Sequence, residues 1–437
     1  MPRSPSSTPH SPLAQKAVVY RAATTRLLFL LLAVCSHAFA SDYDASTAAM
    51  LAAPTPTAKA ENTHTVTLNS LLAPFVRWDA VYFLAIADRG YVHEQEFAFF
   101  PGLPLVMRAV AAWIPGLQRD QALMLAGVIV SNLSFVAAAV VLYRLGCVVL
   151  GDERQAYRAA ILFAITPAGL FMSAIYTESL FALLSFSGML CFSNGRSVLA
   201  ALLWAGATLV RANGVLHAGF FIWAGAVAPF IAKKKISATS FVLGFMKAAR
   251  LAVLVAAPFV AIQWYAYGLF CNAASSVPER PWCTSHLPSI YSFVQKEYWN
   301  NGYLTYYEAR QIPNFLLAAP TFLISFAGLA HHMSRDPRGF FSLGSWPSPS
   351  LPRSRFATGQ APYIYLWLFL TVYSATMMHV QVVTRFFTSV PAFYWFAATA
   401  VGDGKPAAVG WRRAIVPYFL LYGLITAVLF ANFLPPA

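Results

Sequence analysis

The stretch ALMLAGVIVSNLSFVAAAVVLY, residues 122–143, carries no charged side chain. A helix that crosses a bilayer needs about 20 mostly apolar residues, so this stretch predicts a membrane span. About eleven runs of this kind occur, some short enough to merge or re-enter, and we expect about 8–12 spans. The runs lie at 25–40, 122–143, 158–175, 178–194, 198–213, 215–232, 249–270, 313–330, 361–378, 384–401 and 414–432. The predicted fold class is an all-α, polytopic transmembrane helical bundle.

The overall composition agrees with this prediction. Of the 437 residues, 58% are hydrophobic and only 11% are charged, whereas soluble domains carry roughly 25% charged residues. So little charge does not suffice to cover the surface of a water-soluble protein.

The formal net charge of +14 indicates membrane topology. A nucleic-acid-binding protein gathers Lys and Arg on one face or along one helix. Here they cluster between the apolar runs, as they do in cytoplasmic connections under the positive-inside rule. The clusters are Lys16-Arg21-Arg26, Arg144-Arg154-Arg158, Lys233-Lys234-Lys235-Lys247-Arg250, Arg335-Arg338-Arg353-Arg355 and Lys405-Arg412-Arg413. We therefore expect no nucleic-acid partner and a cytoplasmic N-terminus.

This topology divides the chain into four regions. They are a cytoplasmic tail without regular structure at 1–24, a first transmembrane anchor at 25–40, a lumenal loop at 41–120, and a multispanning transmembrane domain at 121–437 with a second lumenal loop at 271–312. A cleaved signal peptide is the alternative for the anchor, because Ala38-Phe39-Ala40 resembles a signal-peptidase site. The charged region before the anchor is long for a signal peptide, which favours retention.

The first lumenal loop contains an amphipathic pattern. Between Val76 and Asp88, apolar residues recur at helical spacing beside charged ones, and Gly90 follows as a cap. The pattern predicts an interfacial helix on the lumenal leaflet. A second amphipathic piece follows Pro101-Gly102-Leu103-Pro104.

The predicted interfacial helix carries a candidate catalytic carboxylate in the sequence Arg77-Trp78-Asp79-Ala80. The same loop also contains Asp88, Glu94, Glu96 and the aromatic run 97–101. Such a segment suits the floor of a sugar pocket. The alternative is that Asp79 is a solvated surface acid, as most aspartates are.

Three charged residues lie at the predicted lumenal ends of apolar runs, namely Glu178, Arg211 and Arg385. A charge at the centre of a bilayer costs about 2.5 to 3.5 kcal/mol, so these side chains are not expected to face lipid. One interpretation is that they border a shared cavity with Asp79. The alternative is snorkelling or ion pairing that only anchors the helix ends.

A polar group precedes the last of these arginines. His379 and Gln381 follow an apolar run, and Gln381 shares a helix face with Arg385 at the i to i+4 spacing. Because a guanidinium binds phosphate oxygens bidentately, this segment is a candidate phosphate or sugar contact.

The cysteines and the known ligand motifs give limited information. Cys271 and Cys283 close a short segment on the predicted lumenal side. The sequence is compatible with a disulfide between them and with two free thiols. The sequence shows no Cys/His metal cluster, Walker motif or GxGxxG pattern, so we expect no bound metal.

The chain resembles the PIG-V family, the second mannosyltransferase of glycosylphosphatidylinositol (GPI) anchor assembly, in ordered blocks along most of its length. Ala212 departs mildly from the expected small polar residue, and 41–75 and 334–360 match poorly. The matching blocks are Arg77–Leu84, Gly90-Tyr91, Phe97–Pro101, Ser173–Ala182, Arg211–Gly214, Pro281–Cys283, Leu287–Tyr291, Gln311–Phe315 and His379–Phe386.

The resemblance implies a GT-C type glycosyltransferase of the endoplasmic reticulum membrane, with a lumenal active site. Its donor substrate would be dolichyl-phosphate mannose, without a cofactor. Its acceptor would be a mannosylated GlcN-phosphatidylinositol precursor, which receives a second mannose in α1,6 linkage with inversion. A small accessory membrane subunit is a further implied partner. The alternatives are a dolichyl-phosphate-sugar transferase of N-glycan or protein mannosylation, a transporter, or a non-catalytic membrane subunit.

Inversion by single displacement requires a carboxylate base within hydrogen-bond reach of the attacking hydroxyl. We assign that role to Asp79, with Glu178 as the rival base. Cationic side chains stabilise the leaving phosphate, and Arg211 and Arg385 are the candidates. Arg77 is placed near a lipid phosphate. The full set of candidate substrate-binding residues is Arg77, Trp78, Tyr176, Arg211, Asn213, His379, Gln381 and Arg385.

Overall fold

The computed structural model describes residues 11–40, 43, 67–231, 237–271, 280–343, 346, 359–402 and 406–435. The regular elements in these ranges are all helices, which confirms the predicted all-α class. Most of 41–66 and the basic residues Lys233-Lys234-Lys235, Arg353, Arg355 and Lys405 lie outside the described residues.

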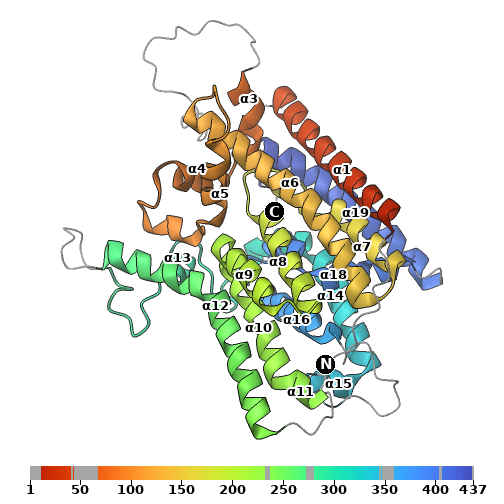
Figure 1. Cartoon of the computed structure of the whole chain (residues 1–437). Helices are drawn as coiled ribbons and strands as arrows, with labels where there is room; N and C mark the ends of the chain where they lie inside the picture. The colour runs from red at the N-terminus through yellow and green to blue at the C-terminus, as the bar shows by residue number, and fades with distance from the viewer. Residues whose placement is uncertain are drawn as a thin grey trace, which may run out of the picture.

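Long helices form the body of the protein. Helix α1 (Pro12–Phe39) packs against α6 (Arg119–Leu150) and α19 (Pro406–Ala431), and the three lie side by side in Figure 1. The other helices of the body are α7 (Glu153–Ala164), α8 (Glu178–Ser193), α9 (Ser197–Val210), α10 (Ala218–Ile222), α11 (Ala228–Ile231), α12 (Ala238–Phe270), α14 (Ile312–Arg335), α15 (Pro337–Phe341), α16 (Ala361–Thr376), α17 (Val383–Phe386) and α18 (Pro391–Gly402).

Five helices of the described residues are long and apolar enough to cross a membrane, or six if one bent pair forms a single span. The other predicted runs are also helical, but they are shorter or interrupted. The run 158–175 ends as an α-helix at Ala164 and resumes as a 3-10 turn at Gly169–Met172, because Pro167 and the left-handed Gly169 (φ 51°) break it. The sequence predicts about 8–12 spans, some of them short; in the described residues, five or six helices have the length and composition of a full span, and several other apolar segments form shorter helices.

Helix α1 begins at Pro12, where the side chain of Ser11 accepts a hydrogen bond from a first-turn backbone N–H. The prediction of an irregular tail over 1–24 is therefore wrong for residues 12–24. Arg26, which we assigned to a cytoplasmic basic cluster, is 2% exposed inside the bundle. Its guanidinium donates to the carbonyl oxygen of Gly169 at 3.0 Å. Arg26 therefore stabilises the interruption between α7 and α8 from inside the bundle and does not face the cytoplasm.

The first polar loop folds into short helices at one end of the bundle (Figure 1). Helix α4 occupies the stretch that the sequence predicts as an interfacial helix and is capped by Gly90 (φ 82°), but it begins at Ala80 rather than near Val76, because Trp78 adopts a left-handed φ of 54°. The elements of this loop are α3 (Leu68–Leu72), η1 (Ala73–Phe75), α4 (Ala80–Arg89), η2 (Glu94–Ala98) and α5 (Gly102–Ala111).

Glu96 closes the turn that follows α4. It accepts hydrogen bonds from Arg89 and from the backbone N–H groups of Val92 and His93. Burial alone would raise the pKa of Glu96, but these hydrogen bonds outweigh it and hold the pKa below its usual value. Glu96 is therefore an ionised structural acid that stabilises the loop.

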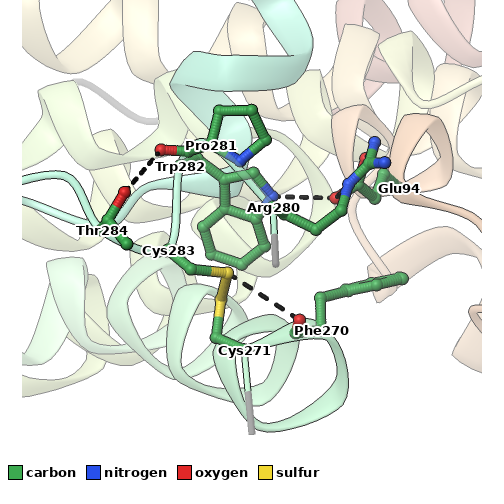
Figure 2. Close-up of a disulfide and its surroundings, with 8 residues drawn as sticks. All are labelled: Glu94, Phe270, Cys271, Arg280, Pro281, Trp282, Cys283 and Thr284. Atoms are coloured by element: carbon green, nitrogen blue, oxygen red, sulfur yellow. Dashed lines mark hydrogen bonds and ion pairs between the residues drawn. A yellow bond between two sulfur atoms is a disulfide. The ribbon is translucent and has the colours of Figure 1, made fainter. Parts of the chain in front are cut away.

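The second polar loop is tied to the first by a buried carboxylate. Glu94 accepts hydrogen bonds from the guanidinium of Arg280 and, at 2.8 Å, from the indole N–H of Trp282 (Figure 2). Cys271 and Cys283 form a disulfide beside this contact, which is one of the two alternatives left open by the sequence. The loop continues into α13 (Ile290–Glu297). The two loops thus form one polar cap.

Close backbone packing at Gly102 generates a prediction. A Cβ atom at this position would lie 2.8 Å from the backbone of Leu209 and Val210, at the end of α9. We expect Gly102→Ala to destabilise the protein by about 1–3 kcal/mol through overpacking. Thermal unfolding in detergent measures the effect. Gly219→Ala is the matched control, because a Cβ there meets nothing within 4 Å, and equal unfolding temperatures of the two variants would contradict the prediction.

Candidate active site

Asp79 stands at the N-terminus of α4, directly after the left-handed Trp78. Its backbone N–H donates to the hydroxyl of Tyr176 at 2.9 Å, and that hydroxyl donates to the carbonyl oxygen of Arg77 at 3.2 Å. A left-handed conformation is costly for a residue with a side chain, so it persists only where surrounding contacts hold it. The buried tyrosine supplies two such contacts and holds the backbone on both sides of Trp78.

Glu178 is the first residue of α8 and is fully buried. Its Oε1 accepts a hydrogen bond from Nε of Arg385 at 2.7 Å and forms an ion pair with Nη1 of Arg211 at 3.1 Å. Arg211 is the capping residue directly after α9, and Arg385 lies in α17. One carboxylate therefore joins the ends of three helices that are far apart in the sequence.

The same arginine reaches Asp79 by a longer contact. Nη1 and Nη2 of Arg385 lie 3.4 and 3.5 Å from Oδ2 of Asp79. The Asp79 side chain is 30% exposed, whereas that of Glu178 is not exposed at all. Of the two carboxylates, Asp79 is the one that a ligand can reach.

Aromatic rings complete the surroundings of both guanidinium groups. Arg385 lies 4.5 Å from the ring centroid of Phe171 and 4.9 Å from that of Tyr176. Arg211 lies 4.8 Å from the centroid of Phe386. Such cation–π contacts favour the charged form in a partly dehydrated site.

A cavity of about 470 Å³ opens beside Asp79 and both arginines. This volume falls within the range of about 300–1,000 Å³ that is typical of ligand sites. The lining combines polar side chains with many aromatic rings. The lining includes Asp79, Arg211, Asn213, Gln295, Asn301, His379 and Arg385, with Phe83, Phe99, Phe100, Tyr291, Trp299, Phe369 and Tyr373 among the rings.

The cavity brings together half of the residues that the sequence singled out. Asp79, Arg211, Asn213, His379 and Arg385 line it. Tyr176 and Glu178 are buried behind it, where they hold these groups in place. Gln381 lies outside the lining, and its amide oxygen is buried without a hydrogen-bond partner among the described residues.

Arg77 and Trp78 do not line the cavity. Arg77 is 2% exposed and donates to the carbonyl oxygen of Ala431 at 3.3 Å, so its predicted place near a lipid phosphate is wrong. Trp78 packs on Phe433, with ring centroids 5.3 Å apart. Both contacts come from the C-terminal end of the chain, which no local pattern in the sequence connects to these residues.

The sequence reasoning missed the contribution of the second polar loop. Gln295, Trp299 and Asn301 line the cavity, and His379 donates from Nε2 to the carbonyl oxygen of Trp299 at 2.8 Å. The usable signal was an amide residue within a short amphipathic helix, followed by a tryptophan and a second amide residue just after that helix. In the described ranges, the His, Cys, Asp and Glu side chains form no group of three or more that could hold a metal ion.

Comparisons with known proteins give consistent matches. The model of the family "Mannosyltransferase (PIG-V)" matches residues 15–437. A Cricetulus griseus protein named GPI alpha-1,6-mannosyltransferase 2 is 34% identical over 97% of this chain and 98% of its own length. The Chaetomium globosum GPI mannosyltransferase 2 is 35% identical, covering 84% and 85%. An Archaeoglobus fulgidus oligosaccharyltransferase structure aligns with a TM-score of 0.42 and 14% identity, over 93% of this chain and 54% of that one.

The shared carboxylate of Glu178 generates a stability prediction. Glu178→Gln leaves two largely buried guanidinium groups without the charge that they share, and we expect a loss of about 3–5 kcal/mol. Thermal unfolding in detergent measures it. Asp88→Asn is the matched control, because Asp88 pairs with Arg119 where both side chains are more than half exposed. Such a pair contributes about 0–1 kcal/mol, so similar losses in both variants would refute the buried-pair account.

Proposed function

This chain belongs to the PIG-V family of mannosyltransferases, and we propose from that premise that Asp79 is the base of its transfer reaction. The enzyme adds mannose in α1,6 linkage during GPI-anchor synthesis, the activity in the names of its relatives. We propose dolichyl-phosphate mannose as the donor and a one-mannose GlcN-phosphatidylinositol precursor as the acceptor. The family assignment argues against the transporter, silent-subunit and other dolichyl-phosphate-sugar transferase alternatives.

The observation that carries the mechanism is the unequal exposure of the two carboxylates. Asp79 faces the cavity, whereas Glu178 is buried and its Oε1 is shared by two arginines. A general base must come within hydrogen-bond reach of the proton that it removes. Asp79 is accessible to an acceptor in the cavity, whereas Glu178 is not. We therefore assign Glu178 a positioning role for Arg211 and Arg385.

The reaction proceeds as a single displacement in this proposal. The acceptor hydroxyl oxygen attacks C1 of the donor mannose while Asp79 takes the hydroxyl proton. The bond between C1 and the phosphate oxygen breaks, and dolichyl phosphate leaves with the electron pair. Arg385 and Arg211 line the cavity as preorganised cations that stabilise the charge developing on the phosphate.

The Arg385 contact with Asp79 supports an order of events. At 3.4 to 3.5 Å, the contact is longer than a strong charged hydrogen bond of about 2.7–2.9 Å. A bound phosphate competes for the same two guanidinium nitrogens. Donor binding therefore draws Arg385 from Asp79 and leaves the carboxylate available to the acceptor hydroxyl.

We place the active site on the lumenal side of the endoplasmic reticulum membrane. The Cys271–Cys283 disulfide lies in the loop that Glu94 joins to the Asp79 loop, and disulfides persist in oxidising compartments such as this lumen. The positive-inside pattern of the remaining basic clusters supports the same side. A small accessory membrane subunit stays part of the proposal.

Mannose transfer by microsomes tests the assignment of the base. We expect Asp79→Asn to lower the rate of transfer from dolichyl-phosphate mannose to the one-mannose precursor by about 10²–10⁴-fold, because the amide cannot accept the proton. Asp88→Asn makes the same chemical change at the surface and is expected to retain wild-type activity. Full activity of Asp79→Asn at normal protein abundance would exclude this base.

A further inference from the structure

One wall of the cavity has no role in the chemistry described above. It comes from the second polar loop, where Gln295, Trp299 and Asn301 face the same cavity as Asp79. These residues follow the Glu94 contact and the disulfide in the chain (Figure 2). The wall is thus part of a loop that is fixed at its start.

The two amide side chains of this wall form a pair. Nδ2 of Asn301 donates to Oε1 of Gln295 at 2.6 Å, and the backbone N–H of Asn301 donates to the carbonyl oxygen of Gln295 at 2.9 Å. Asn300 adopts a left-handed φ of 49° in the turn between them, a conformation that asparagine tolerates well. The turn therefore presents both amides at one place.

One acceptor atom of this amide pair has no hydrogen-bond donor within the described part of the protein. Oδ1 of Asn301 is buried and has no hydrogen-bond partner among the described residues. Buried polar atoms are normally paired, and an exception asks for an explanation. Because Oδ1 has almost no accessible surface, a ligand hydroxyl would supply the missing donor once the Asn301 amide turns toward the cavity, and amide N–H groups can in turn donate to hydroxyl oxygens.

An aromatic ring accompanies the pair. Trp299 lies 5.7 Å from Phe99 between ring centroids, in an edge contact, and its carbonyl oxygen accepts from His379. His379 stacks on Tyr306, with centroids 4.5 Å apart. Because a carbonyl only accepts, Nε2 of His379 carries the hydrogen. The backbone of Trp299 is thereby fixed, and Trp299 lines the same cavity as the two amides, which adds an apolar ring to a wall with hydrogen-bonding groups.

We propose that Gln295 and Asn301 form a hexose-binding subsite, in which the amides bind hydroxyl groups of a substrate mannose beside the ring of Trp299. This inference rests on the proposed function. Donor and acceptor both carry mannose, so the shared chemistry is a ring with several hydroxyl groups. The pair is a specificity element, separate from the proton transfer by Asp79.

Steady-state kinetics of the purified full-length protein in lipid nanodiscs test the subsite. Donor and acceptor concentrations are varied in turn for wild type, Gln295→Ala and Asn301→Ala. We expect KM for one of the two substrates to rise about tenfold or more, with a smaller change in kcat, because hydrogen bonds to the bound sugar are lost. The substrate whose KM rises identifies the mannose that is bound.

Control variants separate recognition from folding. Lys296→Ala changes an exposed residue of the same helix, and we expect wild-type constants from it. If the alanine variants fail to fold, Gln295→Glu and Asn301→Asp replace them, because they preserve the shape of the side chains. We expect these variants to raise KM as well, because the amide N–H donors are lost. Unchanged KM values for both substrates in these variants would overturn the subsite. Absence of transfer by wild type would instead overturn the proposed function.

Discussion

The carboxylate of Glu178 is the interaction on which the candidate site depends. It is fully buried and shared between Arg211 and Arg385, so it joins the start of α8, the end of α9 and α17. A buried charge is tolerated only where opposite charges and hydrogen bonds compensate it. Two guanidinium groups provide that compensation here. Because Glu178 takes the shorter contact with Arg385, Asp79 keeps only a long one and stays open to the cavity.

The position of Glu178 follows from a break in the apolar helices. Between α7 and α8 the chain leaves the α-helical path, and its freed carbonyl groups would be costly in an apolar environment. Arg26 of α1 binds the carbonyl oxygen of Gly169, Asn132 of α6 binds that of Ser173, and Ser131 binds that of Ala174 at 2.7 Å. Polar side chains of two membrane helices thus stabilise the segment that carries Tyr176 and Glu178.

The polar cap explains how one cavity can draw on both loops. Glu94 connects the loop that carries Asp79 with the loop that carries the Gln295–Asn301 pair, through Arg280 and Trp282. Arg280 is one-third exposed, so water screens its charge, but the hydrogen bond from Trp282 is buried. The disulfide lies beside this contact (Figure 2). The proposed catalytic and recognition groups are therefore held in one arrangement, which favours a largely preformed site.

The sequence by itself determined the helical class, the amphipathic character of α4, and the candidates Asp79, Arg211 and Arg385, because these depend on local periodicity and on the cost of placing charge near lipid. Tertiary structure alone decided which charged side chains are buried and which reach the cavity. Arg77 is buried by the end of the chain at Ala431, and Arg26 is buried against Gly169. The number of long spans was also decided this way, since packing against other helices lets a broken or short apolar segment stay buried. The burial and ion pairing of these side chains depend on contacts between residues far apart in the sequence, and local sequence patterns do not predict such contacts.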